Sequence, residues 1–114
     1  MGPSLLLVER EHALRFAIRR FFEARRVAVE VCTPADAAAF AEHRFDAVIL
    51  DYCRDDDTAA RALVAACRAV NPATVVVLLA DGEVADFPAD AVRKKPLPLD
   101  ELARVLGIGV EVGA

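Results

Sequence analysis

Hydrophobic residues in this chain gather in short, nearly uninterrupted runs that are separated by segments of helical spacing. The runs lie at residues 5–8, 27–31, 47–50, 74–79 and 91–92. Short apolar runs without alternation are typical of strands that are buried on both faces of a parallel sheet. We therefore predict five strands at these positions.

The segments between the strands favour helices. Between residues 11 and 25 apolar side chains recur every three or four positions, as in a helix with one buried face. Further helices are predicted over about 34–42, from a cap at Asp57 to about 70, and from 99 to an end at Gly107. Strands that alternate with helices through short connections predict an α/β fold, in which helices cover both faces of a mostly parallel sheet.

Length and charge limit the kinds of function that the chain can have. Its 114 residues correspond to one domain and leave no room for a separate output module. The formal charge is −4, and the longest basic run is Arg93-Lys94-Lys95. Nucleic-acid binding needs clustered basic residues, so nucleic acid is not expected as a direct partner.

Neither a membrane segment nor a metal-binding cysteine motif is evident. No apolar stretch approaches the roughly 18 to 20 residues that span a bilayer, and the first residues lack the basic start of a signal peptide. We expect a cytoplasmic protein without membrane contact. The three cysteines, Cys32, Cys53 and Cys67, are interpreted as reduced structural residues.

Candidate chemistry lies where the predicted strands end. Ligands of open α/β sheets bind beyond the carboxyl ends of the strands. The residues at these ends are Glu9 and Arg10, Asp51, Leu79 and Ala80, and Lys95.

These strand-end blocks resemble the receiver domain of two-component response regulators. Leu5 to Glu11, Phe45 to Asp51, Val75 to Ala80 and Lys95-Pro96 resemble the family's four blocks in order and spacing. The resemblance covers a core of residues 4–106 and leaves 107–114 as a C-terminal tail. It implies a single receiver domain over 1–114 with a flavodoxin-like three-layer fold around a five-stranded parallel sheet.

The resemblance also implies a phosphoryl acceptor. Asp51 aligns with the aspartate that takes phosphate from a histidine kinase or a small phosphodonor, and Lys95 with the lysine that stabilises the transferred group. Ala80 matches the small residue that leaves room for phosphodonors, and the Lys95-Pro96 peptide matches one that is cis in the family. The implied role is signal transduction through protein partners, not enzymatic turnover.

The family's magnesium site is only partly retained. Glu9 matches its first acidic position, and Cys53 aligns with the residue whose backbone carbonyl completes the site, so Glu9, Asp51 and that carbonyl are the remaining candidate ligands. The second acidic position is Arg10, whose charge repels a cation. Either the Arg10 guanidinium approaches Asp51 and replaces the metal, or it points to solvent.

The family's conformational switch is missing. Leu79 takes the place of the Thr or Ser that bonds the phosphoryl group, and Val92 takes the place of the aromatic residue that moves with it. Only sixteen positions separate Leu79 from Lys95, so the family's fourth helix is expected to be shortened or missing. That helix belongs to the surface through which receivers commonly form homodimers or bind their targets.

Two interpretations of function remain after these departures, and a third is less favoured. The chain is an atypical receiver with Asp51 as its candidate phospho-acceptor, or a phosphorylation-independent pseudo-receiver that acts as a protein-interaction module. A flavin or nucleotide binder on the same scaffold would need a phosphate-binding loop after the first strand. Glu9-Arg10-Glu11 contains no glycine and is mostly acidic, which argues against such a loop.

Overall fold

The apolar runs form five parallel strands of one sheet in the order β2-β1-β3-β4-β5. The computed structural model describes residues 2–40 and 42–110. Its strands are β1 (Ser4–Val8), β2 (Ala28–Val31), β3 (Ala47–Asp51), β4 (Val75–Ala80) and β5 (Ala91–Lys94). The prediction of five strands is confirmed, and β2 and β5 form the two edges of the sheet.

The central strands lack a polar face because both of their faces are covered. Leu5 and Leu7 of β1 point into one apolar cluster, whereas Leu6 and Val8 point into the cluster on the opposite face. All four side chains are buried. Successive side chains of a strand alternate between faces, so a strand inside three layers must be apolar at every position.

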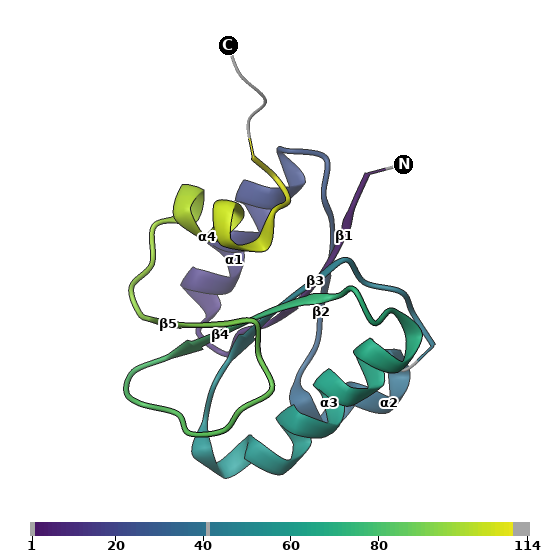
Figure 1. Ribbon diagram of the computed structural model, residues 1–114. Helices are drawn as coiled ribbons and strands as arrows, with labels where there is room; N and C mark the ends of the chain where they lie inside the picture. The colour runs from purple at the N-terminus through teal and green to yellow at the C-terminus, as the bar shows by residue number, and fades with distance from the viewer. Residues whose placement is uncertain (1, 41, 111–114) are drawn as a thin grey trace.

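Helices cover the two faces in pairs, as Figure 1 shows. Helices α1 (His12–Glu23) and α4 (Leu99–Leu106) pack on one face, through residues that include Ile18, Phe22 and Leu102. Helices α2 (Ala37–Phe40) and α3 (Asp57–Val70) lie on the other face. Two 3₁₀ turns, Pro34–Asp36 and Arg54–Asp56, precede α2 and α3.

Some predicted helix boundaries need correction. The helix predicted over 34–42 is a 3₁₀ turn followed by a single α-helical turn, and its predicted residue 41 lies outside the described residues. The prediction that Asp57 caps α3 is wrong, because α3 begins at Asp57 and the capping position is Asp56. The predicted end of the last helix is confirmed, since Gly107 has the left-handed φ of 73° that glycine tolerates best.

No helix forms between β4 and β5, among residues that the structure describes in full. The segment 81–90 instead folds over the face that α3 covers, where Val84, Phe87 and Ala89 pack against the apolar cluster. Arg61 and Arg68 of α3 donate hydrogen bonds to the carbonyls of Asp86 and Pro88 at 2.9 and 2.6 Å. The expectation of a shortened or missing helix is therefore confirmed.

The cysteines, the helix lengths and the C-terminal tail are also the subject of predictions. Cys32 and Cys67 are buried, Cys53 is half-buried, and none of the three forms a disulfide. Within the described residues no helix is long and apolar enough to cross a bilayer. The predicted tail lies partly outside the described residues, which end at Val110.

Candidate functional site

Three strand ends bring the candidate residues to one edge of the sheet. Asp51 is the last residue of β3, and Glu9 directly follows β1. Lys95 directly follows β5 and precedes a cis peptide bond to Pro96, as the resemblance implies. The carboxyl ends of parallel strands point the same way, so their side chains meet although they are far apart in sequence.

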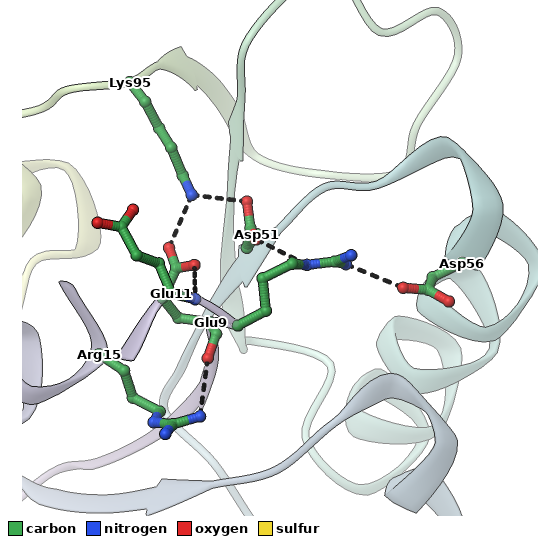
Figure 2. A network of polar contacts seen from close by, with 7 residues as sticks. Glu9, Glu11, Arg15, Asp51, Asp56 and Lys95 are labelled. Atoms are coloured by element: carbon green, nitrogen blue, oxygen red, sulfur yellow. Dashed lines mark hydrogen bonds and ion pairs between the residues drawn. The ribbon is translucent and has the colours of Figure 1, made fainter. Parts of the chain in front are cut away.

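Lys95 joins the two carboxylates. Its Nζ lies 2.7 Å from Asp51 Oδ1 and 2.9 Å from Glu9 Oε1. The side chain of Glu9 is 0% exposed, that of Asp51 12% and that of Lys95 17%. Figure 2 shows Lys95 reaching between the two acids. The second Glu9 oxygen accepts the backbone N–H of Glu11 at 3.1 Å, so both of its oxygens have partners.

This environment keeps Lys95 charged. Burial acts to lower the pKa of Lys95, but the hydrogen bonds and charges of Asp51 and Glu9 outweigh it and raise the pKa above its ordinary value. The ammonium group is therefore a permanent positive charge beside Asp51 at physiological pH.

A second cation approaches Asp51 from the connection that follows β1. Arg10 Nε donates to Asp51 Oδ2 at 3.1 Å, and Arg10 Nη2 donates to Asp56 Oδ2 at 2.9 Å. Burial opposes the charge of Arg10, but hydrogen bonding to Asp56 and Cys53 and the charge of Asp51 leave its pKa raised. Of the two alternatives for Arg10, the structure has the one in which the guanidinium contacts Asp51.

The candidate metal ligands are already engaged with donors of the protein. The Asp51 oxygens bind Lys95 and Arg10, and the backbone carbonyl of Cys53 accepts the N–H of Asp56 at 2.9 Å. Among the described residues no group of three or more His, Cys, Asp or Glu side chains is arranged to hold a metal ion. A hard dication needs several free oxygens. The arrangement around Asp51 therefore does not fit Mg²⁺ while Arg10 lies there.

The switch positions carry no hydroxyl or aromatic ring. Leu79 is buried at the end of β4, and Val92 on β5 is 39% exposed. Leu79 lines a cavity of about 380 Å³ that has apolar walls, which include Ile18 and Leu102, and charged residues, Glu11, Asp81 and Lys95. Ala80 is buried and fills little space beside the site. Neither Leu79 nor Val92 can transmit a hydrogen bond from Asp51 to the surface.

Asp51 is reached through a second cavity, of about 260 Å³, on the side of the site toward β2. Its lining includes Glu9, Arg10, Arg15 and Asp51. Arg15 Nη1 donates to the backbone carbonyl of Glu9 at 3.4 Å, which holds Arg15 beside this cavity. Two guanidinium groups therefore face the space in front of the candidate acceptor.

Sequence reasoning missed the role of Asp56. The run Asp55-Asp56-Asp57 is interpreted most simply as a solvated turn and a helix cap, and nothing in its spacing distinguishes one aspartate from the next. In the structure Asp56 holds Arg10, whereas Asp57 accepts from the Tyr52 hydroxyl at 2.7 Å and from Arg61 at 2.8 Å. An arginine at an otherwise acidic strand end was the one available signal that a carboxylate partner lies nearby.

The two histidines of the chain lie away from the site. His12 and His43 are both exposed, His12 at the start of α1 and His43 after α2. His12 Nδ1 lies 2.8 Å from Arg15 Nη2, and the His43 ring packs edge-on against Phe40. Neither ring contacts the candidate acceptor.

No protein-family model and no curated protein matches the sequence. The fold is similar to that of a CheY chemotaxis protein from Vibrio cholerae, with a TM-score of 0.78 at 16% identity over 94% of this chain and 98% of that chain. A CheY-like response regulator receiver domain protein from Methanospirillum hungatei gives 0.76 at 16% identity, over 94% and 92% of the two chains.

A third similar structure is the receiver domain of a sensor histidine kinase from Pseudomonas aeruginosa, which was solved with a magnesium ion coordinated in its active-site cleft. Its TM-score is 0.73 at 21% identity, over 93% of this chain and 95% of that chain. Likeness at such identities concerns the fold and not the chemistry. The predicted flavodoxin-like architecture is confirmed, and the chain has the fold of response regulator receiver domains.

Proposed function

We propose that this chain is an atypical receiver of two-component or phosphorelay signal transduction, with Asp51 as its phospho-acceptor. One observation carries the proposal: the Asp51 carboxylate lies at the end of the central strand β3 with Lys95 Nζ 2.7 Å from Oδ1. The core of residues 4–106 forms the receiver module.

The chemistry follows from this pair. The carboxylate of Asp51 attacks the phosphorus of a donor, and an acyl phosphate forms as the donor's leaving group departs. Negative charge builds up on the transferring group, and the ammonium group of Lys95 stabilises it. Ala80 leaves the approach open because its side chain is a single methyl group.

The proposed partners are a histidine kinase or another signalling protein. The chain itself is a substrate and a signal carrier, not an enzyme with turnover. The surface through which receivers commonly dimerise is altered here, because residues 81–90 form no helix. A homodimer of this chain would therefore have to form through a different surface.

A second candidate function is favoured by the Arg10 contact and by Leu79. In this alternative the ion pairs hold the site permanently in one charge state, and the domain binds its partner without phosphorylation. Leu79 supports the alternative because its side chain cannot bond a phosphoryl oxygen.

A two-dimensional amide NMR titration with beryllofluoride, which imitates an aspartyl phosphate, carried out in the absence and in the presence of Mg²⁺, distinguishes the two candidates. Saturable shifts around Glu9, Asp51 and Lys95 that disappear in Asp51→Asn are expected for a working acceptor. An absence of shifts at millimolar ligand in the folded protein would contradict the acceptor role and favour the phosphorylation-independent module.

A further inference from the structure

Arg10 lies where a transferring phosphoryl group would need positive charge. Its Nε is 3.1 Å from Asp51 Oδ2, whereas Lys95 holds the opposite oxygen, Oδ1. A phosphoryl group that joins Asp51 must therefore come within reach of both cations. Such a transfer is limited mainly by positioning and by neutralisation of charge.

The guanidinium group of Arg10 is held in place but has N–H donors left for a phosphoryl group. Nη2 donates to Asp56 at 2.9 Å, so the group is held at its outer end, and 51% of the side chain remains exposed. A guanidinium carries five N–H donors in a rigid fork, and in this arrangement Arg10 uses some of them for Asp51, Asp56 and Cys53. The remaining donors suit phosphoryl oxygens, which guanidinium groups bind in bidentate geometry.

We propose that Arg10 supplies the charge that a divalent ion would otherwise supply, so that Asp51 is phosphorylated without metal. This inference rests on the proposed acceptor role of Asp51. The donor is a small acyl phosphate: an Asp51 oxygen forms a bond to phosphorus, the bond from phosphorus to the acyl oxygen breaks, and the carboxylate leaves with that electron pair. Neither a proton nor an oxidant is needed.

The cavity beside Asp51 gives such a donor a place. It measures about 260 Å³ and is lined by Arg10 and Arg15. Small acyl phosphates carry their negative charge on the phosphoryl group, so two guanidinium groups in front of the nucleophile attract the end of the molecule that reacts. Glu9 does not cancel this attraction, because its buried carboxylate is already paired with Lys95 at 2.9 Å.

The test is phosphorylation by acetyl phosphate, followed by intact-protein mass spectrometry, in excess EDTA and in millimolar Mg²⁺. The wild-type chain is expected to gain one phosphoryl group at similar rates in both conditions, and Asp51→Asn none. Removal of a single stabilising donor costs about 100-fold or more in rate, which is the loss expected for Arg10→Ala in EDTA. Arg10→Lys keeps the charge but not the fork and is expected to lie between them.

Arg54→Ala is the matched control. Arg54 is an exposed arginine on the turn that holds Asp56, so this variant changes the net charge by the same amount and should react like wild type. An amide spectrum of each variant checks that it is folded.

The possible failures are distinguishable. Labelling of wild type that requires Mg²⁺ would overturn the inference and leave the acceptor role of Asp51 intact. Equal rates for Arg10→Ala and wild type in EDTA would overturn it as well. No labelling in either condition, together with no response to beryllofluoride, would overturn both the inference and the acceptor role.

Discussion

Arg10 and Lys95 hold the Asp51 carboxylate from opposite oxygens, at 3.1 and 2.7 Å. The carboxylate therefore cannot rotate without breaking an ion pair. Because Arg10 also binds Asp56, this contact joins the connection between β1 and α1 to the turn that precedes α3. The site is set by side chains from three separate parts of the chain.

Replacing Arg10 with aspartate should create a magnesium site. The substitution removes the competing cation and adds oxygen ligands beside Glu9 and Asp51, which is the donor set that Mg²⁺ prefers. We expect saturable amide shifts with Mg²⁺ in Arg10→Asp and none in wild type, measured by NMR titration. Arg10→Ala separates the two effects, since it removes the charge without adding a ligand. Equal Mg²⁺ affinities of Arg10→Asp and wild type would contradict the electrostatic account.

Removing Lys95 should destabilise the fold. Glu9 is 0% exposed, and without Lys95 its buried charge loses its cation. Breaking a buried ion pair from one side costs about 3 kcal/mol in the free energy of unfolding. Urea denaturation of Lys95→Met is expected to show a loss of this size, and a second change, Glu9→Gln, should recover part of it. A Lys95→Met variant as stable as wild type would show that the ion pair with Glu9 contributes little to the free energy of unfolding.

The same pair predicts an alkaline pH dependence. The pKa of Lys95 is raised in the folded chain above its ordinary value of 10.5, since the two carboxylates outweigh the effect of burial. A raised pKa of a base contributes stability that is complete below the unfolded value and is lost as the pH rises through the folded value. The difference in urea midpoint between wild type and Lys95→Met should therefore narrow above about pH 10.5. A constant difference up to the alkaline limit would contradict this assignment.

The strands and the position of Asp51 could be predicted because they depend on local patterns. Val48 and Ile49 are successive apolar residues, as a strand buried on both faces requires. The apolar run 47–50 ends at the residue before Asp51. The family resemblance then placed Glu9 and Lys95 at the same edge. In the structure Lys95 lies within ion-pair distance of both Glu9 and Asp51.

The partners of Arg10 and the path of residues 81–90 could not be predicted, because they depend on contacts between distant segments. Asp56 and Arg10 are 46 positions apart, and the sequence does not fix which of three adjacent aspartates contacts Arg10. The segment 81–90 has no periodicity of its own, and its course is set by Arg61 and Arg68 on α3. The prediction that Asp57 caps α3 is wrong for a related reason: the Asp57 carboxylate binds Tyr52 and Arg61, not a helix N–H.

Removing Arg61 should loosen the segment 81–90 without unfolding the domain. Arg61 donates to Asp57 and to the Asp86 carbonyl, and its guanidinium lies 5.1 Å from the centre of the Phe87 ring. Exposed ion pairs of this kind contribute little to the free energy of unfolding, so the domain itself should stay folded. Hydrogen exchange at the Asp90 amide, which donates to Val76, is expected to speed up several-fold in Arg61→Ala.

Arg104→Ala is the control for this experiment. Arg104 forms an exposed ion pair with Asp100 four positions earlier on α4 and makes no described contact with 81–90. Hydrogen exchange at the Asp90 amide in Arg104→Ala should be as fast as in wild type. An unchanged rate in Arg61→Ala would mean that the apolar contacts of Phe87 hold the segment by themselves.

Thiol reactivity should separate Cys53 from the two buried cysteines. Burial raises the pKa of Cys32 to about 12 from 9.0, and burial also raises the pKa of Cys67. Only the thiolate reacts, and a pKa of about 12 instead of 9.0 leaves Cys32 with roughly a thousandth as much thiolate near pH 8. Iodoacetamide followed by peptide mass spectrometry is expected to modify Cys53 first. Modification of Cys32 at the rate of Cys53 in the folded protein would contradict its burial.

Strand β5 is an edge of the sheet: no strand among the described residues pairs with its outer side, and no helix forms in the segment that leads to it. An edge of this kind is a template for pairing with the edge of another molecule, which is how native proteins come to aggregate. Arg93 and Lys94 are both exposed on this short strand, and two copies aligned there would bring like charges together. Arg93 and Lys94 are thus interpreted as protection of the edge against edge-to-edge association, in a molecule whose net charge is negative.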